Sequence, residues 1–250
     1  MPALAWLGYS EIVICLAALC ILVVKRQWKN YWALGSFLAV RFASDVSLTV
    51  INHFLNRVDR ITAYRAYFYV YWTAFAIESV LALFIVYGIF RLTMEPLKGL
   101  QRLGTILFCV VAGISVALAM GSAFGPHMNG MRYLMAAVSH LQRTQSMLTL
   151  GMLLFVFLAM RPTGISGGSK IFGVGLGMGV LAISDLVRSG FAFRPHMGYL
   201  MVNLINSVVI CAILLLWTAY FALPEPERLE IDDRSRLLRW NGACLARYRM

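Results

Sequence analysis

The chain has 250 residues, of which 60% are apolar and only 13% are charged, and its formal net charge is +11. An ordinary soluble domain carries about 25% charged residues, so this composition, with a mean hydropathy of +0.75, indicates an integral membrane protein. It excludes a disordered, collagen-like or disulfide-framework protein. The positive charge requires no nucleic-acid partner, because membrane proteins concentrate Lys and Arg in their cytoplasmic loops.

Seven apolar stretches are long enough to cross a bilayer, whose hydrocarbon core needs about 20 residues of helix. Their apolar runs are continuous rather than alternating, which favours helices over a β-barrel. In chain order they cover residues 4–24, 31–55, 63–90, 104–121, 131–160, 171–193 and 198–222. We therefore predict an all-α integral membrane protein, with a seven-transmembrane-helix bundle at residues 1–222 and a cytoplasmic amphipathic tail at residues 223–250.

The distribution of Lys and Arg sets the expected orientation of these spans. The side reached after the first, third and fifth spans carries eight of these residues, and the opposite side carries five. The tail adds six arginines to the first side. Because cytoplasmic loops are enriched in Lys and Arg, we expect the N-terminus outside and the C-terminus in the cytoplasm, in an inner (plasma) membrane of bacterial type.

The connections before the fifth and seventh predicted spans repeat one pattern. Residues 124–128 read FGPHM and residues 193–197 read FRPHM, and a Tyr-Leu-Met triplet follows each, at Tyr133 and Tyr199. Short motifs also recur by chance in a chain of biased composition. The match of both parts of the pattern nevertheless favours duplicated helical hairpins, as found in some transporters.

Seven charged side chains lie inside the predicted spans, although each ionised group at the bilayer centre costs about 2.5–3.5 kcal/mol. Glu11 lies nearer the outer end of its span, and helical spacing places the other six on faces that carry further polar groups. We expect these faces to meet in an outward-facing polar cavity. The residues expected to line it are Arg41, Asp45, Tyr71, Glu78, Tyr133, His140, Arg143, Asp185, Arg188, Tyr199, Asn203 and Asn206.

Such a cavity indicates a protein that binds and moves a small solute or ion. Its carboxylates would be proton or cation sites, its arginines would adjust them or hold an anionic substrate, and His140 would be the group sensitive to pH. Two alternatives stay open. In a structural or assembly subunit, three arginines and three carboxylates would simply neutralise one another. In a sensory subunit, the cavity would bind a ligand and the tail would relay the signal.

Four glycines, Gly173, Gly175, Gly177 and Gly179, form two overlapping G-x-x-x-G faces in the sixth predicted span. This pattern predicts close helix packing, either within the bundle or between the protomers of a homo-oligomer. The tail is first acidic and then basic with interleaved apolar residues. It fits an amphipathic helix on the inner leaflet, or a docking segment for a cytoplasmic partner.

No pattern in the chain indicates catalysis or a cofactor. His53, His127, His140 and His196 are expected near the outer side, and adjacent methionines make a copper site the alternative to simple interfacial histidines. No ligand set with metal-binding spacing accompanies them. All four lysines lie between spans, so none is available in the last span for a retinal Schiff base. We expect no metal, no cofactor and no enzymatic activity.

Overall fold

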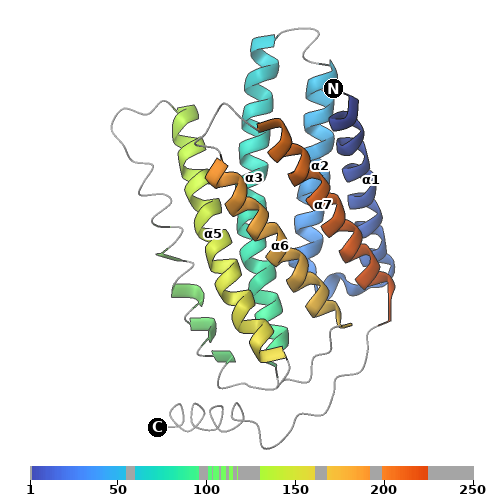
Figure 1. Cartoon of the computed structure of the whole chain (residues 1–250), viewed down its shortest axis with the longest axis vertical. Coiled ribbons are helices and arrows are strands. Elements are labelled where there is room, and N and C mark those ends of the chain that lie inside the picture. The colour runs from blue at the N-terminus through green and yellow to red at the C-terminus, as the bar shows by residue number, and fades with distance from the viewer. Residues whose placement is uncertain are drawn as a thin grey trace, which may run out of the picture.

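A computed structural model of the whole chain shows a bundle of long helices (Figure 1). It describes residues 2–54, 60–95, 101–102, 104–106, 108–110, 113–114, 117, 130–160, 168–191 and 199–224. The helices are α1 (Pro2–Val24), α2 (Trp32–Phe54), α3 (Arg60–Thr93), α5 (Gly130–Met160), α6 (Lys170–Phe191) and α7 (Tyr199–Ala222), and a short 3-10 turn, η1 (Gln27–Lys29), follows α1.

The prediction of an all-helical chain is confirmed for the described residues. Six of the helices are long and apolar enough to cross a membrane. Their ends fall within three residues of the predicted ones, the largest difference being the extension of α3 by three residues at each end. The predicted span at 104–121 lies largely outside the described residues, and α3 ends and α5 begins at opposite ends of the bundle (Figure 1). The repeated segments at 124–128 and 193–197, and the tail from residue 225, also lie outside them.

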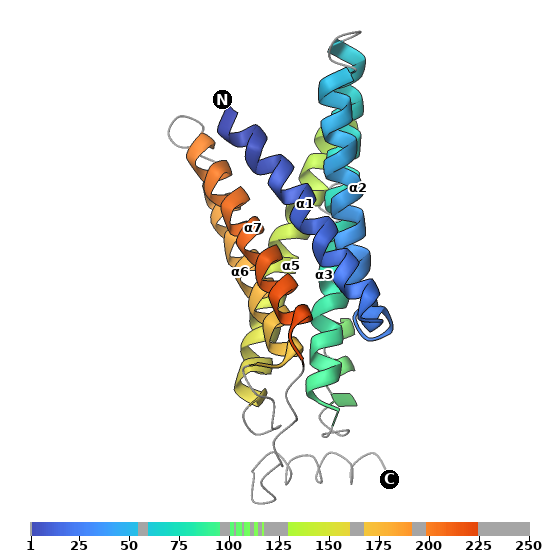
Figure 2. The same ribbon diagram turned by 90° about the vertical axis from the view of Figure 1, so that its right-hand side faces the viewer.

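The six helices form a closed ring. Going round it, α1 contacts α2, α2 contacts α3, and the sequence continues through α5, α6 and α7 back to α1. Helices α3 and α6 also contact each other across the ring. Figure 2 shows α6 and α7 diverging from α2 and α3 toward the end at which α1 begins, and converging at the other end. The bundle therefore has a wide end and a narrow end.

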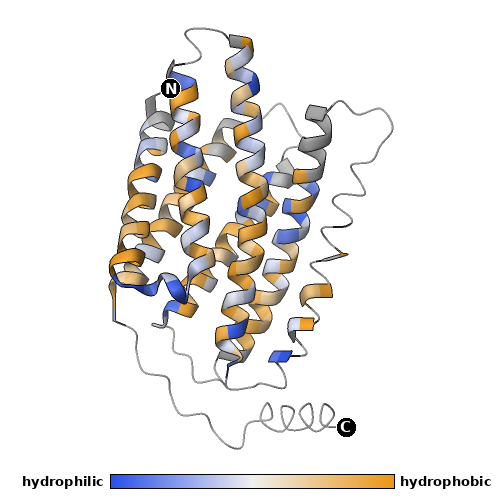
Figure 3. Cartoon of the chain, turned by 180° about the vertical axis from the view of Figure 1, so that it is seen from behind, coloured by the Kyte–Doolittle hydropathy of each residue, from blue (hydrophilic) through white to orange (hydrophobic). Residues whose placement is uncertain are grey.

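An apolar core closes the narrow end. Its largest fully buried side chains include Trp217, Phe90, Leu34 and Met178, and the Phe37 ring packs edge-on against Trp217 at 6.2 Å between centroids. The outer faces of the helices are also largely apolar (Figure 3), with exposed side chains such as Leu158. A water-soluble bundle would place polar residues there, so this exterior suits the acyl chains of a membrane.

The glycines of α6 bring it close to both of its neighbours in the ring. A Cβ atom at Gly173 would meet the Tyr220 ring, and one at Gly177 would meet Trp217, both on α7. A Cβ atom at Gly175 or Gly179 would lie against Leu153 of α5. Both glycine faces are therefore occupied within the chain, which matches the intramolecular form of the predicted packing and leaves no open glycine face for a second protomer.

Replacing Gly177 by alanine should destabilise the bundle. The added methyl group overlaps the Trp217 indole, which is itself fully buried, so α6 and α7 must move apart. We expect a loss of about 1–3 kcal/mol, measured by equilibrium unfolding in mixed detergent micelles. Gly151→Ala in α5 is the matched control, because a Cβ atom there meets nothing within 4 Å. Equal stability of the two variants would contradict the packing described here.

Candidate functional site

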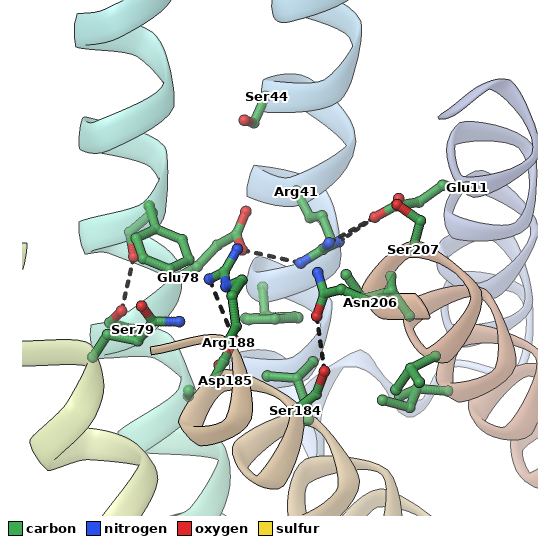
Figure 4. Close-up of a pocket in the computed structure, with 18 of the residues that line it drawn as sticks. Glu11, Arg41, Ser44, Glu78, Ser79, Ser184, Asp185, Arg188, Asn206 and Ser207 are labelled. Carbon is green, nitrogen blue, oxygen red and sulfur yellow. Dashed lines mark hydrogen bonds and ion pairs between the residues drawn. The ribbon is translucent and has the colours of Figure 1, made fainter. Parts of the chain in front are cut away.

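A cavity of about 200 Å³ lies inside the ring, lined by residues near the middle of the helices. All six helices contribute side chains to it, and Figure 4 shows its polar residues pointing toward one another. Phe37, Ala82 and Ile213 line its apolar part, next to the core of the narrow end. Its polar lining consists of Glu11, Arg41, Ser44, Asp45, Tyr71, Glu78, Ser79, Gln142, Gln145, Ser184, Asp185, Arg188, Asn206 and Ser207.

The Arg41 guanidinium joins three helices at the centre of this lining. Its Nε and Nη2 donate to Oε1 of Glu11 on α1, at 2.9 and 2.6 Å. Its Nη1 donates to Oε2 of Glu78 on α3, at 3.2 Å (Figure 4). All three side chains are at most 15% exposed. Because so little water reaches these groups, each charge is stabilised mainly by the opposite charges beside it. The hydrogen bonds of the arginine therefore fix the relative positions of α1, α2 and α3.

A second group of contacts ties α6 to α3 and α7. Arg188 donates to Asp185, one turn earlier on α6, at 3.4 Å, and its guanidinium carbon lies 5.2 Å from the centre of the Phe75 ring on α3. The Ser184 hydroxyl donates to Oδ1 of Asn206 on α7 at 2.8 Å (Figure 4). Ser184 thus joins α6 to α7 and Arg188 joins it to α3, and the Ser-Asp pair of α2, starting at Ser44, lines the same cavity.

The charges of the cavity do not balance. Four carboxyl groups line it, from Glu11, Asp45, Glu78 and Asp185, against the two guanidinium groups of Arg41 and Arg188. Arg143 was expected in this group and Glu11 was not, but Glu11 lines the cavity whereas Arg143 is exposed on α5. Ionised, the described lining carries a net charge of −2, which a bound proton or cation would offset.

Two buried polar atoms of the lining have no hydrogen-bond partner among the described residues: Oδ2 of Asp45 and Nε2 of Gln142. Asp45 also forms no ion pair there, although Arg41 lies one turn away on the same helix face. Gln142 is 8% exposed. Unsatisfied groups of this kind are rare in protein interiors, and water or a ligand usually satisfies them. The carboxylate oxygen of Asp45 can accept a hydrogen bond, and the amide nitrogen of Gln142 can donate one.

A second cavity, of about 260 Å³, extends the first one toward the wide end of the bundle. The two cavities share Glu11, Asp45 and Leu48, and the second is also lined by Tyr9, Thr49, Asn52 and Tyr67. Tyr9, Asn52 and Tyr67 are exposed, so this cavity reaches the surface. The outer cavity therefore lies between the charged cavity and the surface, on the side of α1 that holds the N-terminus.

Seven of the twelve predicted site residues line the first cavity: Arg41, Asp45, Tyr71, Glu78, Asp185, Arg188 and Asn206. The structure does not describe the side chains of Tyr133, Tyr199 and Asn203. His140 and Arg143 are exposed on α5 and do not line the cavity. Arg143 lies about 25 Å along α5 from Met160, close enough to the outer boundary of a bilayer for its long side chain to reach the headgroups.

Helix α5 presents a different face to the cavity from the predicted one. Gln142 and Gln145 line it, and Ser146 and Thr149 continue the same buried face toward the narrow end. Gln145 donates to the Thr149 hydroxyl at 3.2 Å. The i, i+3, i+7 spacing of Gln142, Gln145 and Thr149 is the sequence signal that could have identified this face. Glu11 was visible as an intramembrane charge, but nothing in its local sequence identified Arg41 as its partner.

No metal site forms among the described residues. No group of three or more His, Cys, Asp or Glu side chains is close enough there to hold an ion. His53 and His140 are exposed on α2 and α5, and His127 and His196 lie outside the described residues. The copper alternative therefore stays a prediction about residues that the structure does not describe.

Comparisons with known proteins give no match: no family model, no curated relative and no solved structure resembles the chain significantly.

Removing the guanidinium of Arg41 should strongly destabilise the protein. Arg41→Met leaves the buried Glu11 and Glu78 without their shared cation, and we expect a loss of about 3 kcal/mol in mixed-micelle unfolding. Adding Glu11→Gln and Glu78→Gln should restore part of that loss, because no uncompensated carboxylate remains. Arg143→Met is the matched control, since Arg143 is exposed, and it should change stability by less than about 0.5 kcal/mol. Similar losses for Arg41→Met and Arg143→Met would contradict this assignment.

Proposed function

We propose that the protein binds a small solute or ion in the charged cavity and carries it across the membrane. The observation that supports this proposal is a cavity of about 200 Å³ inside a ring of apolar helices, with ionisable side chains from four of them. Ionisable residues inside a membrane are costly, and those that face a cavity commonly form ion or solute pathways.

The unbalanced lining favours this proposal over a purely structural network. A network that only specifies packing would pair its charges and fill its centre with side chains. Here the carboxylates outnumber the guanidinium groups, and Asp45 is left without an ion pair among the described residues. The cavity also has room for several water molecules, at about 30 Å³ each.

We propose that the wide end faces the outside of an inner (plasma) membrane, with seven spans and the tail in the cytoplasm. The excess of Lys and Arg on the side of the narrow end supports this orientation. The cavity would then open outward, and the apolar core around Phe37 and Trp217 would form the barrier to the cytoplasm. Transport would require the two arms seen in Figure 2 to close at the wide end and part at the narrow end.

A cysteine introduced at Ser207 should report the aqueous cavity directly. In a variant whose five native cysteines are replaced, we expect Ser207→Cys to react with a cationic methanethiosulfonate reagent about tenfold faster than with an anionic one, because the lining is negative. The reaction should proceed from the outer side and, during transport, also from the cytoplasmic side. It is measured as the mass shift in right-side-out and inside-out vesicles.

The control for this labelling is Met147→Cys, whose side chain is exposed on the outer face of α5. A thiol in contact with lipid should react slowly with either reagent. Equal rates at the two positions would show that the cavity holds no water and would overturn the proposal. Reaction of Ser207→Cys from the outer side alone would favour a sensory subunit over a transporter.

Transport itself should depend on the carboxylates of the lining. Proteoliposomes on a solid-supported membrane should give a transient current after a concentration jump of at least one cation among protons, Na⁺, K⁺ and choline. We expect the combined variant Asp45→Asn, Glu78→Gln and Asp185→Asn to lose this current. Asp45→Asn alone, which breaks no described ion pair, should reduce it at least tenfold.

Two further variants make this current test decisive. His140→Gln with Arg143→Gln should keep the current, because both residues are exposed and lie away from the cavity. Deleting residues 225–250 should also keep it, whereas a sensory subunit would lose its output with the tail. A full current in the combined carboxylate variant, with the protein still monodisperse, would refute transport through this cavity.

A further inference from the structure

A column of aromatic rings runs along α3 beside the two cavities. Tyr67 stacks on Tyr71 with 6.2 Å between ring centres and 5° between planes, and Tyr71 stacks on Phe75 at 5.9 Å and 13°. The three residues are four apart, so the column follows one face of the helix. Tyr67 lines the outer cavity, whereas Tyr71 and Phe75 line the inner one. The rings therefore extend from the entrance to the charged centre.

The inner end of this column already contacts a cation. The Arg188 guanidinium lies over the Phe75 ring at 5.2 Å, within the range of a cation–π interaction. Such an interaction is stronger where water is excluded, and Arg188 is only partly exposed. The Tyr71 ring, one turn further out, lines the same cavity, and Tyr67 at the outer end of the column lines the outer one.

Asp45 supplies a negative charge at the junction of the two cavities. It lines both of them, its Oδ2 atom has no partner among the described residues, and Arg41 is engaged by Glu11 and Glu78 instead. The outer cavity adds a second aromatic wall from Tyr9 on α1. A carboxylate facing aromatic rings is the arrangement by which proteins recognise ammonium groups that carry alkyl substituents.

We propose that the junction of the two cavities binds a small organic ammonium ion, with its charge against Asp45 and its alkyl groups against Tyr67 and Tyr71. This inference rests on the proposed function, for which it names the class of solute. A bare metal ion fits less well, because the described residues hold no cluster of three or more suitable ligands and aromatic rings replace little of its hydration.

Choline and 3,3-dimethylbutan-1-ol test this proposal as a pair, because they share shape and hydroxyl group and differ in charge. Binding to the full-length protein in nanodiscs is measured by isothermal titration calorimetry, with tetramethylammonium as a second cation. We expect both cations to bind at least tenfold more tightly than the neutral alcohol. Asp45→Asn should abolish that preference, and Tyr71→Leu should weaken binding of the cations about tenfold, whereas Tyr71→Phe keeps the ring and should preserve it.

The results of this titration can contradict the solute class without contradicting the proposed transport, and the reverse. Equal affinities for choline and the alcohol, or cation binding that survives both Asp45→Asn and Tyr71→Leu, would overturn the inference. His140→Gln, on an exposed surface, is the control that should leave affinity unchanged. If choline does not bind while another cation still drives a current, the solute class is wrong and the proposed transport stands. If choline binds but Ser207→Cys labels only from outside, the class is right and transport fails.

Discussion

The guanidinium of Arg41 is the constraint on which the rest of the structure depends. A single charge inside a membrane bundle is tolerated only where opposite charges meet it, and Arg41 directs three donors to Glu11 and Glu78 on two other helices. These hydrogen bonds fix where α1 and α3 cross α2. Because Arg41 pairs with Glu11 and Glu78, it forms no ion pair with Asp45, which lies one turn away on α2. The carboxyl group of Asp45, which lines both cavities without an ion pair among the described residues, is thus a consequence of how the bundle is held together.

The two ends of the bundle depend on each other through helix packing. At the narrow end, glycines of α6 admit the Trp217 and Tyr220 rings of α7, so that these helices approach closely. Toward the wide end, α6 and α7 together diverge from α2 and α3, and the cavity among these helices has charged and polar groups in its lining. The close packing acts as the fixed point from which the helices diverge. A closed apolar end and an open charged end are what a carrier needs if it alternates between two sides of a membrane.

The sequence predicted the helices, because apolar runs of this length are typical of membrane spans. It also predicted most of the helix faces that point into the bundle, because a charged side chain is costly in contact with lipid. On α2, α3 and α6 each charge had to point inward, and Arg41, Glu78 and Asp185 do so. Helix α5 has two polar faces, a charged one with His140 and Arg143 and a neutral one with Gln142 and Gln145. The neutral face is the buried one. Charge alone was a poor guide there, since a long arginine side chain near a helix end can reach the headgroups while a neutral amide costs less to bury than a charge. The pairing of Glu11 with Arg41 is tertiary information that no local spacing contains.

The excess of carboxylates determines which solutes can occupy the cavity. When its four carboxyl groups are ionised, the cavity of about 200 Å³ has a net charge of −2, and an anion would meet repulsion that the two arginines, already paired with carboxylates, cannot offset. A cation or a proton reduces the same charge when it enters. Binding of a cationic solute and release of protons from the lining are therefore linked, because both compete to neutralise the same carboxylates. In the proposed carrier, exchange of one for the other would follow from the charge of the lining itself.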